Sequence, residues 1–149
     1  VPVLVAFVPQ LTGTSGNAGS QASVAVIRGL SLGEIELRDI FRVLWKEIRV
    51  SILCGISLGI VNFIKMFLLN DVSRDKYGLE MALLISFVVC LTMVLSVILA
   101  KIVGCTLPIL AKRLGLDPAV VANPFITTII DVVALLTYFG IARALLGLA

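Results

Sequence analysis

The stretch from Leu79 to Leu110, LEMALLISFVVCLTMVLSVILAKIVGCTLPIL, decides the class of fold. Glu80 and Lys101 are its only charged residues. The stretch is longer than the roughly 20 residues that an α-helix needs to cross about 30 Å of hydrocarbon. Such a run is typical of a transmembrane helix, and its extra length allows the helix to tilt or to project past the membrane.

The composition of the whole chain agrees with a membrane protein. Of its 149 residues, 60% are hydrophobic and 14% are charged, whereas a soluble domain is nearer half apolar and a quarter charged. The mean hydropathy is +1.15. The net charge of +3 is small, and the sequence has no cluster of aromatic and basic residues of the kind that binds bases, so we expect no nucleic-acid partner.

Three further segments are long and apolar enough to be read as spans. The predicted spans are residues 4–28, 50–69, 79–110 and 118–148. Residues 31–46, between the first two, begin with a capping-box pattern at Ser31 and Glu34 and place apolar side chains on one helical face. This pattern predicts an amphipathic helix at the membrane interface or against a partner. The predicted fold class is therefore an all-α integral membrane domain, covering residues 1–149, with four transmembrane helices and one interfacial helix.

Lys and Arg residues predict the direction of the spans. Eight of the 12 lie at one side of the membrane: Arg28, Arg38, Arg42, Lys46, Arg49, Lys101, Lys112 and Arg113. The other side has Lys65, Arg74, Lys76 and Arg143. The positive-inside rule then places the first side in the cytoplasm and the C-terminus outside. If the N-terminus of the whole protein is cytoplasmic, one further helix must precede residues 4–28.

The first span contains a polar segment, Pro9 to Gln21, which reads PQLTGTSGNAGSQ. Gly13, Gly16, Asn17 and Ser20 are spaced i, i+3, i+4 and i+7, so they share one helical face. Small residues allow membrane helices to pack closely, and a bare backbone with flanking oxygens can also line a pore. Packing accounts for the glycines but poorly for the amide side chains, and we favour the pore-lining interpretation.

The last span contains one deep acid, Asp131, preceded at helical spacing by Asn123 and Thr127. An ionised carboxylate at that depth costs several kcal/mol unless it faces water, a cation or a partner. Lys101 is one candidate partner, and a protonated, buried Asp131 is another alternative. Counted along ideal helices, Asn17 and Asp131 lie at similar depths, roughly 16 and 20 Å from the basic side. Carboxylate, amide, hydroxyl and backbone oxygens together suit a hard cation such as Mg²⁺, which would keep much of its water.

These two segments resemble the transmembrane domain of the MgtE family of magnesium channels. The resemblance rests on Pro9, Gly13, Gly16, Asn17, Gly19 and Gln21, then on Leu114-Gly115-Leu116-Asp117-Pro118, Asn123-Pro124, Thr128 and Asp131. It implies a homodimer with five helices per subunit and a pore on the dimer axis, lined here by residues 4–28 and 118–148. The family's first helix and its cytoplasmic regulatory domains, which include tandem CBS domains, are not contained in this chain.

The resemblance also assigns roles to individual residues. The essential pore acid falls on Asp131, and neighbouring pore positions fall on Asn123, Thr127, Gly13, Gly16 and Ser20. Ser20 retains an oxygen where relatives often carry an amide residue. Asn17 belongs to the shared motif and either faces the ion or braces the helix.

The expected function is passive transport of largely hydrated Mg²⁺ across the plasma membrane of a bacterium. Transport of Mn²⁺, Co²⁺ or divalent cations in general, or a structural membrane subunit, are the alternatives. We do not expect an enzyme, because an intramembrane aspartyl protease needs two carboxylates that share a proton and the chain has no His to serve as a general base. Cys54, Cys90 and Cys105 lack metal-binding spacing and are expected to pack as small hydrophobic residues.

Overall fold

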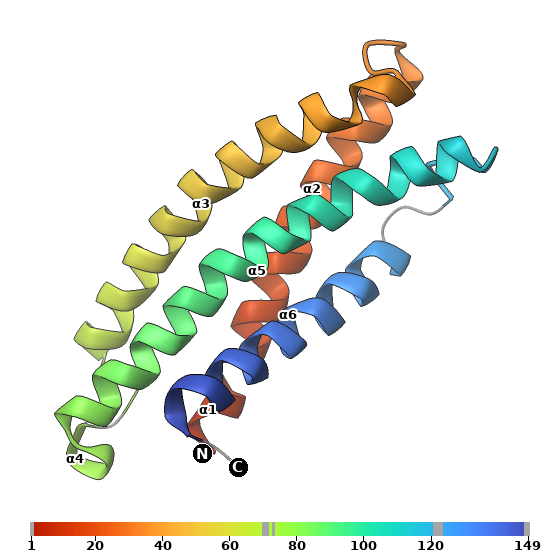
Figure 1. The fold of residues 1–149 in the computed structure, drawn as a ribbon. Coiled ribbons are helices and arrows are strands. Elements are labelled where there is room, and N and C mark those ends of the chain that lie inside the picture. The colour runs from red at the N-terminus through yellow and green to blue at the C-terminus, as the bar shows by residue number, and fades with distance from the viewer. Residues whose placement is uncertain (1, 70–71, 73, 121–123, 148–149) are drawn as a thin grey trace.

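The computed structural model describes residues 2–69, 72, 74–120 and 124–147, and in these ranges every element is a helix. Its long helices run side by side in Figure 1: α2 (Val8–Ser31), α3 (Ile40–Leu69), α5 (Leu79–Arg113) and α6 (Pro124–Leu146). Short helices lie at the ends of the bundle: α1 (Val3–Ala6), the 3₁₀ helix η1 (Leu37–Asp39) and α4 (Arg74–Tyr77). Helix α5 packs against α2, α3 and α6 and is the central helix of the bundle.

Within the described residues, three segments are long and apolar enough to cross a membrane by length and composition: Leu37–Leu69, Leu79–Arg113 and Phe125–Leu146. They contain the predicted spans 50–69 and 79–110 and most of 118–148. The first predicted span, 4–28, is also helical, since α2 has 24 residues, but α2 is not one of the three. Its Gly, Ser, Thr, Asn and Gln residues lower its hydropathy. The all-helical membrane fold is therefore confirmed, whereas the prediction of four spans is not.

The separate amphipathic helix predicted for residues 31–46 is not found. Ser31 is the last residue of α2, and its hydroxyl donates to the Ile27 carbonyl oxygen at 2.9 Å. Gly33, at φ +70°, then ends the helix, because a left-handed backbone is cheap only for glycine. The capping contact falls five residues later than predicted, where the Glu36 N–H donates to the Asp39 carboxylate at 3.0 Å.

Helix α3 begins at Ile40 and continues from the charged segment into the apolar span as far as Leu69. No Pro or Gly interrupts residues 40–54, so nothing in the sequence separates an interfacial helix from the membrane helix. The charged first turns and the span are one rigid element.

The last long helix also begins later than predicted. The Asp117 carboxylate accepts the Ala119 N–H at 2.9 Å and so caps a single turn, after α5 has ended at Arg113. Helix α6 begins at Pro124, a residue that suits a first helical turn because the N–H that it lacks would have no partner there.

Helices α2 and α5 touch backbone to backbone, and this contact fixes the centre of the bundle. A Cβ atom on Gly19 would lie 2.8 Å from the Ala100 carbonyl oxygen and would collide with Cδ1 of Ile130 from α6. A Cβ atom on Gly104 would collide with the Gly19 carbonyl oxygen. Two glycines thus allow three helices to meet, as is common where membrane helices pack through small residues.

Two polar contacts join helices at the end of the bundle where α1 lies. The Gln10 side-chain amide of α2 donates to the Asn62 amide oxygen of α3 at 2.6 Å. The Tyr138 hydroxyl of α6 donates to the Leu4 carbonyl oxygen of α1 at 2.9 Å. Hydrogen bonds between buried groups such as these order helices in a solvent that offers no competing water.

We predict that Gly104→Ala lowers the stability of the bundle by about 1–3 kcal/mol or more, because the added methyl group overpacks the contact with Gly19. Gly140→Ala is the matched control, since a Cβ atom on Gly140 has no atom within 4 Å. Thermal unfolding of both variants in detergent checks the prediction. Equal midpoints for the two variants would show that the backbone contact does not limit the packing.

Candidate cation site

Asp131 lies at the edge of the packed face of α6. The buried residues of this helix are Ile126, Ile130, Ala134, Tyr138 and Ala142, which recur every fourth position. Asp131 follows Ile130 and is half-buried, so its side chain borders the packed face instead of lying beneath it. The contact of Ile130 with Gly19 therefore fixes where the carboxylate is placed.

The Asp131 carboxylate faces the backbone of α2 at Gly16. A Cβ atom on Gly16 would lie 3.7 Å from Oδ1 of Asp131. Because Gly16 has no side chain, the carboxylate approaches the helix surface without an intervening group. The structure thus brings together two of the residues that the sequence singled out from segments far apart in the chain.

The remaining predicted residues of α2 lie around this contact. Gly13 is exposed, and a Cβ atom there would meet nothing within 4 Å. Asn17 is exposed and Ser20 is half-buried. Gln21, one turn after Asn17, is also exposed. This side of α2 is therefore a polar surface that the described part of the chain does not cover.

The small residues of α2 divide between two tasks. Gly19 packs against α5 and α6, as the packing interpretation requires, whereas Gly13 is open and Gly16 faces an acid. The sequence alone does not separate these cases, because all of these glycines belong to the same short polar segment.

On α6 the oxygen-bearing stripe can be followed for one turn. Thr127 is half-buried and precedes Asp131 by one helical turn. Asn123, the third member of the predicted stripe, lies outside the described residues. Asp131 and Thr127 are thus the members of this stripe that the structure places.

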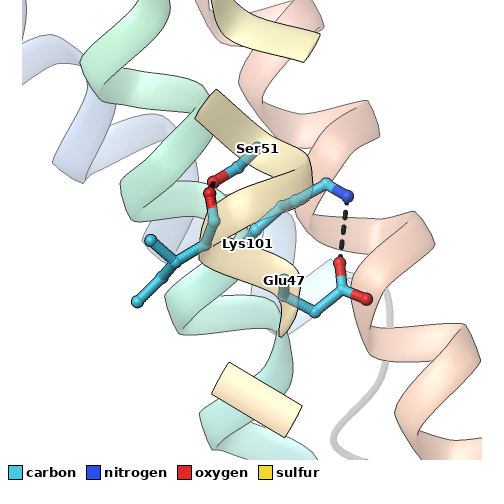
Figure 2. A network of polar contacts seen from close by, with 4 residues as sticks. Glu47, Ser51 and Lys101 are labelled. Atoms are coloured by element: carbon cyan, nitrogen blue, oxygen red, sulfur yellow. Dashed lines mark hydrogen bonds and ion pairs between the residues drawn. The ribbon is translucent and has the colours of Figure 1, made fainter. Parts of the chain in front are cut away.

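Lys101, the candidate partner of Asp131, is instead paired with Glu47. Its Nζ lies 3.0 Å from Oε2 of Glu47, and the two side chains are only 12% and 18% exposed. Figure 2 shows this pair between α5 and α3, beside Ser51, whose hydroxyl donates to the Ile48 carbonyl oxygen at 2.7 Å. Among the described residues, no ion pair to Asp131 is found. The ion-pair alternative for Asp131 is therefore not supported.

Glu47 was not singled out from the sequence, although it forms a largely buried ion pair with Lys101 between α3 and α5. It lies between the predicted interfacial helix, residues 31–46, and the predicted span 50–69, in neither of the two elements. The only signal was Lys101 itself, a cation in an apolar run that needed an acid from another helix.

One described chain does not supply a complete metal-binding cage. Within the described ranges, no three His, Cys, Asp or Glu residues are grouped so that they could hold a metal ion. What the site offers is one carboxylate beside a bare helix backbone and nearby hydroxyl and amide oxygens. These are ligand types for hard cations such as Mg²⁺, not for softer metals.

The fold and the site define a helical membrane protein in which a polar helix and a single deep carboxylate lie against each other. The chain belongs to the MgtE family of divalent cation transporters, which matches residues 8–141. This confirms the resemblance seen in the polar segment and around Asp131. The family is one of transporters, which are not a class of enzymes.

Three relatives illustrate the similarity, and all are named magnesium transporter MgtE. The chain is 40% identical to that of Thermus thermophilus over 146 residues, which are 98% of this chain and 30% of the relative. It is 35% identical to that of Bacillus subtilis over 148 residues, 97% of this chain and 30% of the relative. It is 31% identical to that of Enterococcus faecalis over 140 residues, which are 94% of this chain and 29% of the relative. The chain thus spans about 30% of the length of these relatives.

Proposed function

We propose that this chain is the membrane domain of a passive Mg²⁺ transporter and that the ion passes between α2 and α6 beside Asp131. The observation that carries the proposal is the contact of the Asp131 carboxylate with Gly16. A carboxylate is retained within an apolar helix only if something compensates its desolvation. In the described part of the chain, no cationic side chain forms an ion pair with Asp131. The relatives are named magnesium transporters, and we propose that Mg²⁺ compensates the charge of this carboxylate.

The proposal includes a homodimer. The exposed side of α2 carries Gly13, Asn17 and Gln21, and amide groups and bare backbone are poorly solvated by lipid. A second copy related by a two-fold axis would cover this polar surface with its own equivalent. Two Asp131 carboxylates would then face a shared, water-accessible path lined by α2 and α6.

The proposed ion keeps most of its water. A dimer offers two carboxylates at this depth, and Mg²⁺ dehydrates reluctantly and demands octahedral ligation at about 2.1 Å. Hydroxyl, amide and backbone oxygens can instead accept hydrogen bonds from the waters of the hydrated ion. Such a site would discriminate modestly among ions of similar hydration, which keeps transport of Mn²⁺, Co²⁺ or other divalent cations as the alternative within the same class.

A structural membrane subunit is the alternative from another class. The contact of Gly19 with α5 and α6 favours a structural role for part of α2, but such a role does not account for the exposed amides or for Asp131.

We propose the plasma membrane as the location, with the Lys- and Arg-rich end in the cytoplasm and the C-terminus outside. Regulation by domains that lie outside this chain fits its coverage of about 30% of the relatives.

We predict that Asp131→Asn lowers Mg²⁺ flux into liposomes by at least roughly tenfold, because it keeps the shape of the side chain and removes the charge that holds the hydrated ion. Glu80→Gln is the matched control, since Glu80 is an exposed acid in the first turn of α5, remote in sequence from the site. Flux is measured with a Mg²⁺-sensitive dye in the vesicles. Wild-type flux in a folded Asp131→Asn variant would sink the proposal.

We predict that Gly16→Val abolishes flux and that Gly16→Ala lowers it partially. An Ala methyl group would stand in ordinary contact with the Asp131 carboxylate, at 3.7 Å, whereas the two further methyl groups of Val would enter the space in front of it. The same liposome assay, together with the molecular mass in detergent, checks this. A Gly16→Val variant that transports normally but no longer forms dimers would favour the packing interpretation.

We predict that cobalt(III) hexaammine, an inert mimic of a hydrated divalent ion, inhibits Mg²⁺ flux. A site that recognises the water shell cannot distinguish ammine from aqua ligands by direct coordination. Flux is measured at increasing concentrations of the complex on the outside. Crystallographic density with both Asp131 oxygens about 2.1 Å from Mg²⁺ would contradict the hydrated-ion mechanism while leaving the transport proposal intact.

A further inference from the structure

We propose that a groove between the first turns of α3 and the last turns of α5 binds an anionic phospholipid. This α3–α5 groove is lined by Arg38 and Phe41 on one side and by Leu110 and Arg113 on the other. It lies at the Lys- and Arg-rich end of the bundle, where α3 begins and α5 ends (Figure 1). The proposal concerns a surface remote in sequence from Asp131 and does not depend on the transported ion.

The groove has the volume and the lining residues expected of a site that holds one polar lipid head group over a base of apolar side chains. Its volume is about 450 Å³, within the range of small-molecule pockets. Ile40 and Leu37 from the α3 side and Ile109 from α5 supply the apolar base. Ile109 is buried in the packing of α5 against α2, so this part of the base is fixed by the fold.

Two guanidinium groups border the same groove. Arg38 and Arg113 both line it, and arginine recognises phosphate through paired N–H donors. Arg38 uses Nε to pair with Glu36 at 2.8 Å. A guanidinium has five N–H donors, so this ion pair leaves donors for a phosphate. Two arginines on opposite walls therefore match one anionic head group in charge.

The position of the groove along α3 favours a lipid as the source of the phosphate. The helix Leu37–Leu69 is long and apolar enough to cross a membrane, and Arg42, Lys46 and Arg49 follow the groove before the long apolar run of this helix begins. The groove therefore lies on the head-group side of that run. Phe41 and Trp45 are exposed there by 83% and 64%, and aromatic side chains gather at the level of the head groups. Basic pockets between membrane helices at this level are typical sites for anionic lipids.

The surface that continues from the groove suits acyl chains. Helix α3 packs on its neighbours through a narrow set of residues: Ser51, Gly55, Gly59, Asn62 and Met66. Its other faces expose large apolar side chains along the whole span, including Leu53, Val61 and Leu68. A lipid whose phosphate sits between Arg38 and Arg113 could therefore lay its chains on α3, whereas a soluble phosphate would gain nothing from this surface.

The test uses Phe41→Trp in a Trp45→Phe background, because Phe41 lines the groove, whereas Trp45, the only Trp of the chain, lines the other groove on the α2 side. This single-Trp chain is reconstituted in phosphatidylcholine bilayers that contain equal fractions of brominated phosphatidylglycerol or brominated phosphatidylcholine, and quenching of the introduced Trp reports which lipid lies in the groove. We expect the relative binding constant to favour phosphatidylglycerol by at least about fivefold, since each Arg near the surface contributes about that factor.

The variants separate a site from a general surface attraction. Arg38→Gln with Arg113→Gln should reduce the preference to about one, and the corresponding double substitution by Lys should give an intermediate value. Arg42→Gln with Arg49→Gln is the control, because it removes the same charge from residues of α3 that line a different groove, on the α2 side. This control should keep most of the preference.

Three results would overturn the proposal. The first is the absence of a preference in the single-Trp chain that keeps Arg38 and Arg113, as expected if the groove receives a protein segment. The second is an equal loss in both pairs of Gln variants, which indicates a diffuse electrostatic effect. The third is release of the lipid by millimolar glycerol phosphate, which indicates a site for free phosphate.

Discussion

Where Gly19 of α2 meets Ala100 and Gly104 of α5, two helix backbones touch, and the positions of the other helices follow from this contact. In a membrane, apolar side chains gain little by leaving lipid for another helix, so close packing of small residues has to hold the bundle together. Ile130 of α6 covers Gly19 from the other side. The next residue of α6 is Asp131, and the contact therefore delivers its carboxylate to α2 at Gly16.

Helix α2 therefore packs against its neighbours with one face and contributes to the candidate site with another. On its packed face, Leu11, Ala22 and Val26 are buried in apolar clusters. On the other face, Asn17 and Gln21 are exposed, and neither packing nor lipid accounts for them. A helix of this composition is stable in a membrane only if its polar face meets water, an ion or a matching surface. This requirement joins the physical chemistry of α2 to the proposed transport of a hydrated cation.

The sequence predicted the apolar elements best, because a long apolar run has few alternatives in lipid. The span 79–110 corresponds to α5, Leu79–Arg113. Errors occurred where a local pattern had to compete with its surroundings. Ser31 and Glu34 match a capping box, but Gly33 ends α2 after Ser31, and the next helix, η1, is capped by the pair Glu36 and Asp39 instead. A local match does not reveal which of several capping residues the chain will use.

Of the candidate site, the structure shows the predicted approach of the last span to the glycine face of α2, since Asp131 lies beside Gly16. The isolation of Asp131 in an apolar helix pointed to a special role, and the spacing of Gly13 and Gly16 placed them on one face. Which glycine packs and which faces the acid depends on the distance between helices, which a single sequence does not contain. The Lys101–Glu47 pair also joins two helices. Because Lys101 pairs with Glu47, an ion pair with Lys101 does not account for the acid at position 131. The metal-binding roles of all the predicted site residues stay predictions: Gly13, Gly16, Asn17, Ser20, Asn123, Thr127 and Asp131.

A map of Mn²⁺ sites in crystals of this chain tests the central claim most directly, because the anomalous scattering of Mn²⁺ identifies the ion without reference to its ligands. The account predicts a peak on a two-fold axis between the Asp131 carboxylates of two copies, beside Gly16, that weakens as Mg²⁺ is added. Peaks confined to exposed acids such as Glu34 and Asp117, with none near Asp131, would contradict it.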